Sequence, residues 1–150
     1  MQAGDKSRYY LKAAAIGGAA GGALSAIPFV NWCNCLCCLW VLGAGFLAVY
    51  LVQRWSNLQV TPGEGATVGV LAGLIAGVVD SIISVPLMTA QRTVIAAQIA
   101  RMPPNIRPVM EQLLASGALS AMTVVAWLVV GAIFGTFGGL LGAAILSKRQ

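Results

Sequence analysis

Residues 65–77 read GATVGVLAGLIAG, an uncharged stretch in which glycine returns at every fourth position. Residues four apart lie above one another on the same side of an α-helix, so these glycines would form a smooth stripe. Such a stripe lets two backbones approach closely, which is how helices associate in lipid, where no hydrophobic force drives them together. The stretch therefore predicts an apolar helix packed tightly on a neighbour through Gly65, Gly69, Gly73 and Gly77.

Two further stretches repeat this spacing. The C-terminal stretch, residues 131–144, reads GAIFGTFGGLLGAA, and the N-terminal one lies within the first 25 residues. Three stripes in one chain indicate helix packing far more strongly than one GxxxG pattern does. We expect these helices to pack against each other or against another chain. The additional packing residues are Gly17, Gly21, Gly131, Gly135 and Gly139.

The composition indicates an integral membrane protein. Of the 150 residues, 59% are hydrophobic and 9% are charged, whereas a soluble domain carries about 25% charged residues. Because a bilayer core of about 30 Å requires roughly 20 apolar residues of helix, the charge-poor blocks accommodate four spans. We expect these spans at about residues 11–29, 32–53, 65–88 and 117–146.

The predicted fold is all-α, with a single transmembrane domain over residues 1–150. In it, two helical hairpins form a four-helix bundle held by glycine-zipper packing. Pro28 and Asn31 divide the first hairpin, because proline removes a helical hydrogen bond and asparagine caps a helix. The first and third spans share a small-residue stripe, a serine and a proline near the far end, which predicts two hairpins of parallel orientation. An outer amphipathic segment at about 89–116 links the last two spans.

Lysine and arginine predict the orientation. An even number of spans puts both termini on one side, which carries six basic residues near the membrane, against three on the other side. The excess favours cytoplasmic termini. The net charge of +5 is explained by these flanking residues, so we expect no nucleic-acid partner. The two sets are Lys6, Arg8, Lys12, Arg54, Lys148 and Arg149 on the terminal side, and Arg92, Arg101 and Arg107 opposite.

The side chains that enzymes use are scarce. The chain has no histidine and four acidic residues, and it lacks a Walker loop or a strand-linked GxGxxG pattern. We therefore expect no enzymatic activity and no resident cofactor, although the apolar faces are compatible with lipid or pigment contact.

The four cysteines stand together in CNCLCCLW. Three of them would lie close together on a helix, so a zinc or iron–sulfur site completed by Asp80 or a partner chain is one interpretation. The CxCxCC spacing does not match the usual CxxC pairs of such sites, and we expect no metal there. Interchain disulfides and lipidation are further alternatives, but we favour small apolar residues packed at a membrane interface. The residues are Cys33, Cys35, Cys37 and Cys38.

Asp80 is the one charged residue inside the predicted span at 65–88. A carboxylate within a membrane is costly unless it is paired, hydrated or protonated, so it indicates function by default. Ser81 and Ser84 offer polar partners. Asp80 either serves transport, gating or cofactor contact, or it fixes helix packing through hydrogen bonds.

Three stretches, IPFVNWCNCLCCLW, PGEGATVGVLAGLIAG and GTFGGLLGAAI, together resemble small four-span bacterial membrane proteins with a cysteine-rich second helix. The resemblance covers most of the chain. It implies four spans in a prokaryotic membrane, which we expect to be the bacterial cytoplasmic membrane, and it transfers no catalytic residue.

Three functions follow from these features. The first is a structural or accessory subunit of a larger membrane complex, packed through glycine-rich faces against other membrane subunits and lipids; a homo-oligomer is compatible with the same faces. The second is a small oligomeric channel or transporter that uses Asp80. The third is a metal or redox subunit that uses CxCxCC. We favour the first, because a hydrophilic conduit would require more polar groups within the spans.

Overall fold

The computed structural model describes residues 3–25, 39–57 and 59–147. Its regular elements in this part of the chain are all α-helices, which confirms the prediction of an all-α fold. The first two predicted spans both run into residues 26–38, which lie outside the described residues, as do Pro28 and Asn31. The helices are α1 (Ala3–Ser25), α3 (Leu39–Ser56), α4 (Pro62–Ala90), α5 (Arg92–Ala100), α6 (Arg107–Ser116) and α7 (Ala118–Leu146).

Two of these helices are long and apolar enough to cross a membrane. The qualifying segments are Pro62–Leu87 in α4 and Ala118–Leu146, which is the whole of α7. At 1.5 Å per residue, each segment is longer than a hydrocarbon core of about 30 Å.

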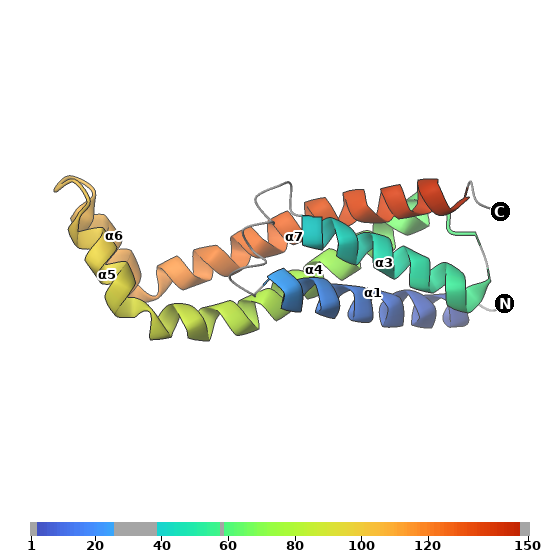
Figure 1. Ribbon diagram of the computed structural model, residues 1–150, viewed down its shortest axis with the longest axis horizontal. Helices are drawn as coiled ribbons and strands as arrows, with labels where there is room; N and C mark the ends of the chain where they lie inside the picture. The colour runs from blue at the N-terminus through green and yellow to red at the C-terminus, as the bar shows by residue number, and fades with distance from the viewer. Residues whose placement is uncertain (1–2, 26–38, 58, 148–150) are drawn as a thin grey trace.

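The four longest helices lie side by side in an elongated molecule, and α5 and α6 form a hairpin at one end (Figure 1). The start of α1 and the end of α7 lie together at the opposite end. Helices α3 and α4 contact each other, and each also contacts both α1 and α7. Helices α1 and α7 do not touch within the described residues. The cross-section is therefore a diamond with α3 and α4 across its short diagonal.

Facing residues show the direction of each helix. Gly18 of α1 faces Ala72 of α4, and one turn later Gly22 faces Ala76, so these two helices run parallel. Helix α7 runs antiparallel to α4, and α3 runs antiparallel to α1 (Figure 1). The first helix of one hairpin therefore runs parallel to the first helix of the other.

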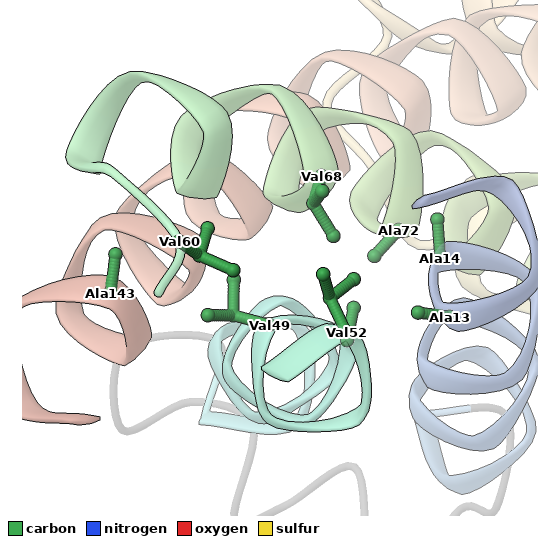
Figure 2. Packing of buried hydrophobic residues seen from close by; sticks show 9 residues of the cluster. Ala13, Ala14, Val49, Val52, Val60, Val68, Ala72 and Ala143 are labelled. Carbon is green, nitrogen blue, oxygen red and sulfur yellow. The ribbon is translucent and has the colours of Figure 1, made fainter. Parts of the chain in front are cut away.

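The core is built from small side chains. Figure 2 shows Val49, Val52, Val60 and Val68 converging between the four helices, and five alanines complete the cluster. The largest fully buried side chains are valines. Large apolar side chains point outward, and the most exposed of them include Ile82, Met122, Val125 and Phe137. Small residues inside and large ones outside are typical of helices that pack against each other in lipid.

Helix α4 begins with a capping box. The backbone N–H of Thr61 donates to Glu64 Oε2 at 3.0 Å, and the N–H of Glu64 donates back to Thr61 Oγ1 at 3.4 Å. Pro62 takes the first helical position, where its missing N–H costs nothing. The sequence TPGE thus fixes where the longest run of glycine packing starts.

The α5–α6 hairpin turns at Pro103 and Pro104, between the end of α5 and the start of α6. Arg107 stabilises the turn, because its Nη2 donates to the carbonyl oxygens of Ala100, at 2.5 Å, and Met102, at 3.2 Å. Gly117 separates α6 from α7 with a left-handed backbone (φ 73°). This residue allows the chain to change direction between the hairpin and the bundle.

Candidate functional site

Among the described glycines, the closest contacts lie in the seam between α4 and α7, where backbone meets backbone. A Cβ added to Gly73 would overlap the carbonyl oxygen of Gly131, and one added to Gly131 would overlap that of Gly73. The same reciprocal contact recurs one turn away in either helix, between Gly69 and Gly135. Such close antiparallel backbones favour Cα–H···O contacts, which replace side-chain packing.

The seam has clear ends. Toward the chain termini, Gly65 and Gly139 repeat the reciprocal contact, and a Cβ on Gly65 would also lie 2.7 Å from the Cβ of Ala143. Toward the α5–α6 hairpin, Gly77 meets Trp127 instead of a glycine, and its added Cβ would lie 3.0 Å from the Trp127 carbonyl oxygen. Close approach thus extends over the three turns in which both helices carry glycine.

Helix α1 packs against two neighbouring helices through two adjacent glycine stripes. Gly17 and Gly21 face α3, where an added Cβ on Gly17 would lie 2.6 Å from the Ala44 carbonyl oxygen. Gly18 and Gly22 face α4, each with an added Cβ 2.5 Å from a carbonyl oxygen. The adjacent GG pairs in the sequence therefore serve two neighbours at once.

The fourth seam joins α3 to α7. Gly45 packs on the carbonyl of Gly135, and Gly138 packs on that of Leu42. The sequence alone does not distinguish the role of Gly45 from that of Gly43, yet an added Cβ on Gly43 would have no neighbour within 4 Å. Gly45 is thus a packing residue that the sequence interpretation missed. All of the glycines predicted to pack helices lie in seams within the chain.

Asp80 lies at the core of a small polar cluster. The residue is 3% exposed, and Ser84 Oγ donates to its Oδ2 at 3.3 Å. Ser81, also buried, donates instead to the Gly77 carbonyl at 2.7 Å. Ser25 is buried on α1, where its hydroxyl has no hydrogen-bond partner among the described residues, and the register of α1 on α4 puts it near the level of Asp80. Ser25, Asp80 and Ser81 are the buried polar residues of the described part, and Ser84 is half-buried.

The predicted cysteine site cannot be assembled from the described residues. Cys33, Cys35, Cys37 and Cys38 all fall within residues 26–38, outside that part. Among the residues that the structure describes, no three His, Cys, Asp or Glu side chains lie close enough together to hold a metal ion.

A polar network ties α1 to α4 at the end that carries the termini. Lys6 Nζ lies 3.3 Å from Glu64 Oε1, and the phenol of Tyr10 also hydrogen-bonds to Glu64. Burial, followed by this hydrogen bond, raises the pKa of Tyr10 to about 12, so its hydroxyl stays protonated as a donor. Tyr10 precedes the apolar stretch that begins at Leu11. The network was not predicted, although TPGE matches a capping-box pattern that was legible in the sequence.

A groove of about 520 Å³ lies between α5 and α6. Its apolar lining comes from both helices, with Ile99 almost fully buried at 4% exposure. Arg92 and Glu111 contribute opposite charges. This volume falls in the range of small-molecule sites, about 300–1,000 Å³. The lining residues are Arg92, Thr93, Ala96, Ile99, Glu111, Leu114 and Ala115.

Comparison with known proteins assigns the family. No curated protein and no solved structure matches the chain. The family described as the MJ1491 transmembrane domain matches residues 11–148, nearly the full length. That match agrees with the two apolar helices long enough to span a bilayer. The protein is therefore a membrane protein that belongs to the MJ1491 transmembrane domain family.

Proposed function

We propose that the chain is a non-enzymatic accessory subunit of a larger membrane complex, built as a four-span bundle with glycine-zipper packing. One observation carries this proposal: the four outer seams of the diamond are closed by contacts of glycine with backbone or small side chains. An aqueous path between two helices requires space at a seam. A closed, rigid bundle is suited to support neighbouring subunits instead of conducting a solute.

The polar content of the bundle supports the same proposal. The buried polar residues of the described part are Ser25, Asp80 and Ser81, at one level of the molecule. A conduit would require polar groups along its whole length, because every ion or water molecule that crosses must replace its hydration. A single polar level is better suited to fixing helix positions than to transport.

We place both termini in the cytoplasm of a bacterial cell. The end of the bundle that carries the termini also carries Lys6, Arg8 and Lys12 of α1 and Arg54 of α3 (Figure 1). The opposite end carries the three arginines of the α5–α6 hairpin. The excess of basic residues at the terminal end supports this orientation.

Partner contact is assigned to the tip of the α5–α6 hairpin. Because the glycine faces are occupied within the chain, they are not free to receive another subunit. The tip exposes Ile106 (46%) and Val109 (56%) beyond the bundle. Apolar residues that are exposed together outside the membrane mark interaction sites.

The test is purification in mild detergent, followed by mass spectrometry of co-purifying chains. The wild type should bring down a defined set of membrane subunits in fixed proportion. Ile106→Ser combined with Val109→Ser should release them, while Val94→Ser, equally exposed on α5, should not. A wild-type protein that migrates without any stoichiometric partner would overturn the accessory role.

A channel or transporter that uses Asp80 is the second candidate, favoured by the burial of that carboxyl group. The third candidate, a metal or redox subunit, depends on the four cysteines. We expect that replacing all four by serine leaves the protein inserted and assembled. Loss of a stoichiometric metal together with loss of assembly would favour the third candidate.

A further inference from the structure

The groove between α5 and α6 opens at the base of the hairpin. Arg92 and Thr93 stand two and three residues after the end of α4, and Leu114 and Ala115 stand a few residues before the start of α7. These two pairs line the groove near the ends of the spanning helices. The tip, at Pro103 and Pro104, contributes nothing to the lining.

The base of the hairpin lies at the level of the lipid headgroups. The apolar run of α4 ends at Leu87, and Arg92 follows five residues later, about 8 Å along a helix. The headgroup layer extends roughly 5–8 Å beyond the hydrocarbon core on each side. A lipid of the adjacent leaflet can therefore reach the groove without leaving the membrane.

The two charged residues of the groove differ in their position along the hairpin. Arg92 is at the base, where lipid phosphates are concentrated, whereas Glu111 lies near the middle of α6, away from the ends of the spanning helices. The hairpin as a whole carries three arginines and one acidic residue. Because the guanidinium of Arg92 is exposed and can form paired hydrogen bonds with a phosphate, the base favours an anionic headgroup.

The floor of the groove is suited to a hydrocarbon chain. Ala96, Ile99, Leu114 and Ala115 offer apolar surface, and the two alanines leave room above it. The volume of about 520 Å³ accommodates part of an acyl chain together with the glycerol of one lipid. An apolar floor next to a single cation thus matches the two ends of a phospholipid.

We propose that the α5–α6 groove binds one anionic phospholipid of the adjacent leaflet, with its phosphate on Arg92 and part of an acyl chain on Ile99 and Leu114. The site is distinct from the hairpin tip, and it does not depend on the accessory role. Lipid binding there would fix the hairpin relative to the membrane surface.

Native mass spectrometry of the full chain tests the site. The protein, released from mild detergent, is offered phosphatidylglycerol and phosphatidylcholine with identical acyl chains at equal concentration. The wild type should retain phosphatidylglycerol preferentially, with one molecule per chain. Arg92→Gln should lower that preference about fivefold, the effect of one arginine near an anionic surface, and Arg92→Lys should retain most of it.

Two matched variants decide whether the groove itself is the site. Arg101→Gln removes another exposed arginine of the same hairpin that does not line the groove, and it should leave the preference unchanged. Ala96→Phe fills the floor and should reduce retention of both lipids. Equal retention of the two lipids by the wild type would overturn the proposal, as would equal losses in Arg92→Gln and Arg101→Gln. If a protein co-purified with the wild type in place of lipid, and only Ala96→Phe released that protein, the groove would be assigned to a protein partner and the lipid proposal would be overturned.

Discussion

Single glycines in this chain differ in what surrounds them, and this difference decides what each substitution does. An added Cβ on Gly73 would overlap a carbonyl, whereas one on Gly43 would have no neighbour within 4 Å. Gly73→Ala should therefore destabilise the bundle by about 1–3 kcal/mol, because the backbones must separate. Gly43→Ala should stabilise it by about 0.5–1 kcal/mol through helix propensity. Thermal unfolding in one detergent measures both, and a Gly73→Ala variant at least as stable as the wild type would refute the packing role of Gly73.

Tyr10 provides a pH-dependent probe of the junction between α1 and α4. Its pKa is raised from 10 to about 12, so its stabilising contribution is complete below pH 10. That contribution is lost as pH rises from about 10 to about 12, because the folded state resists forming the phenolate. Glu64→Ala removes the hydrogen bond and should move the Tyr10 transition to lower pH in absorbance at 295 nm. Tyr10→Phe identifies that transition among the tyrosines, and an unmoved transition would mean that Glu64 has no effect on the phenol.

At the scale of single elements, Gly117 sets the junction between α6 and α7. Its φ of 73° lies in the left-handed region, which costs a residue with a Cβ about 1–2 kcal/mol. Gly117→Ala should therefore loosen the hairpin, while Gly117→Asn should have a smaller effect, because asparagine tolerates this conformation. Hydrogen exchange of α6 measures the result. Gly63→Ala, at an open position with ordinary backbone, is the matched control, and equal exchange in the two alanine variants would contradict this role.

The elements differ in how far the sequence could predict them. The four-residue spacing of Gly65, Gly69 and Gly73 was sufficient to predict a packing face, because helix geometry is local. The neighbour was not predictable, since choosing between α7 and another chain depends on tertiary contacts. The difference between Gly43 and Gly45, like the groove between α5 and α6, depends on how whole helices are placed. Only the TPGE capping box was legible and overlooked.

At the scale of the whole molecule, the two hairpins are related by more than their direction. In each hairpin the first helix presents glycines to the second, as Gly17 does to α3 and Gly73 does to α7. The second hairpin is longer and extends past the described end of α1, where it carries α5 and α6 (Figure 1). A compact bundle thus supports a projecting hairpin, which carries both contacts that we propose: neighbouring subunits at its tip and lipid at its base.

A substitution at Asp80 distinguishes the two leading functions, an accessory subunit and a conduit. The side chain is buried and accepts a hydrogen bond from Ser84, about one turn beyond Gly77, the last glycine of the α4 stripe. Asp80→Asn keeps the size and the acceptor oxygen, so assembly should survive with little loss if the residue only fixes packing. A mechanism that gates or binds a cation would lose its charge in the same variant. Ion and proton flux into proteoliposomes containing purified protein should be indistinguishable from that into empty vesicles for wild type and variant alike. Robust wild-type flux that disappears in Asp80→Asn would replace the accessory role with transport.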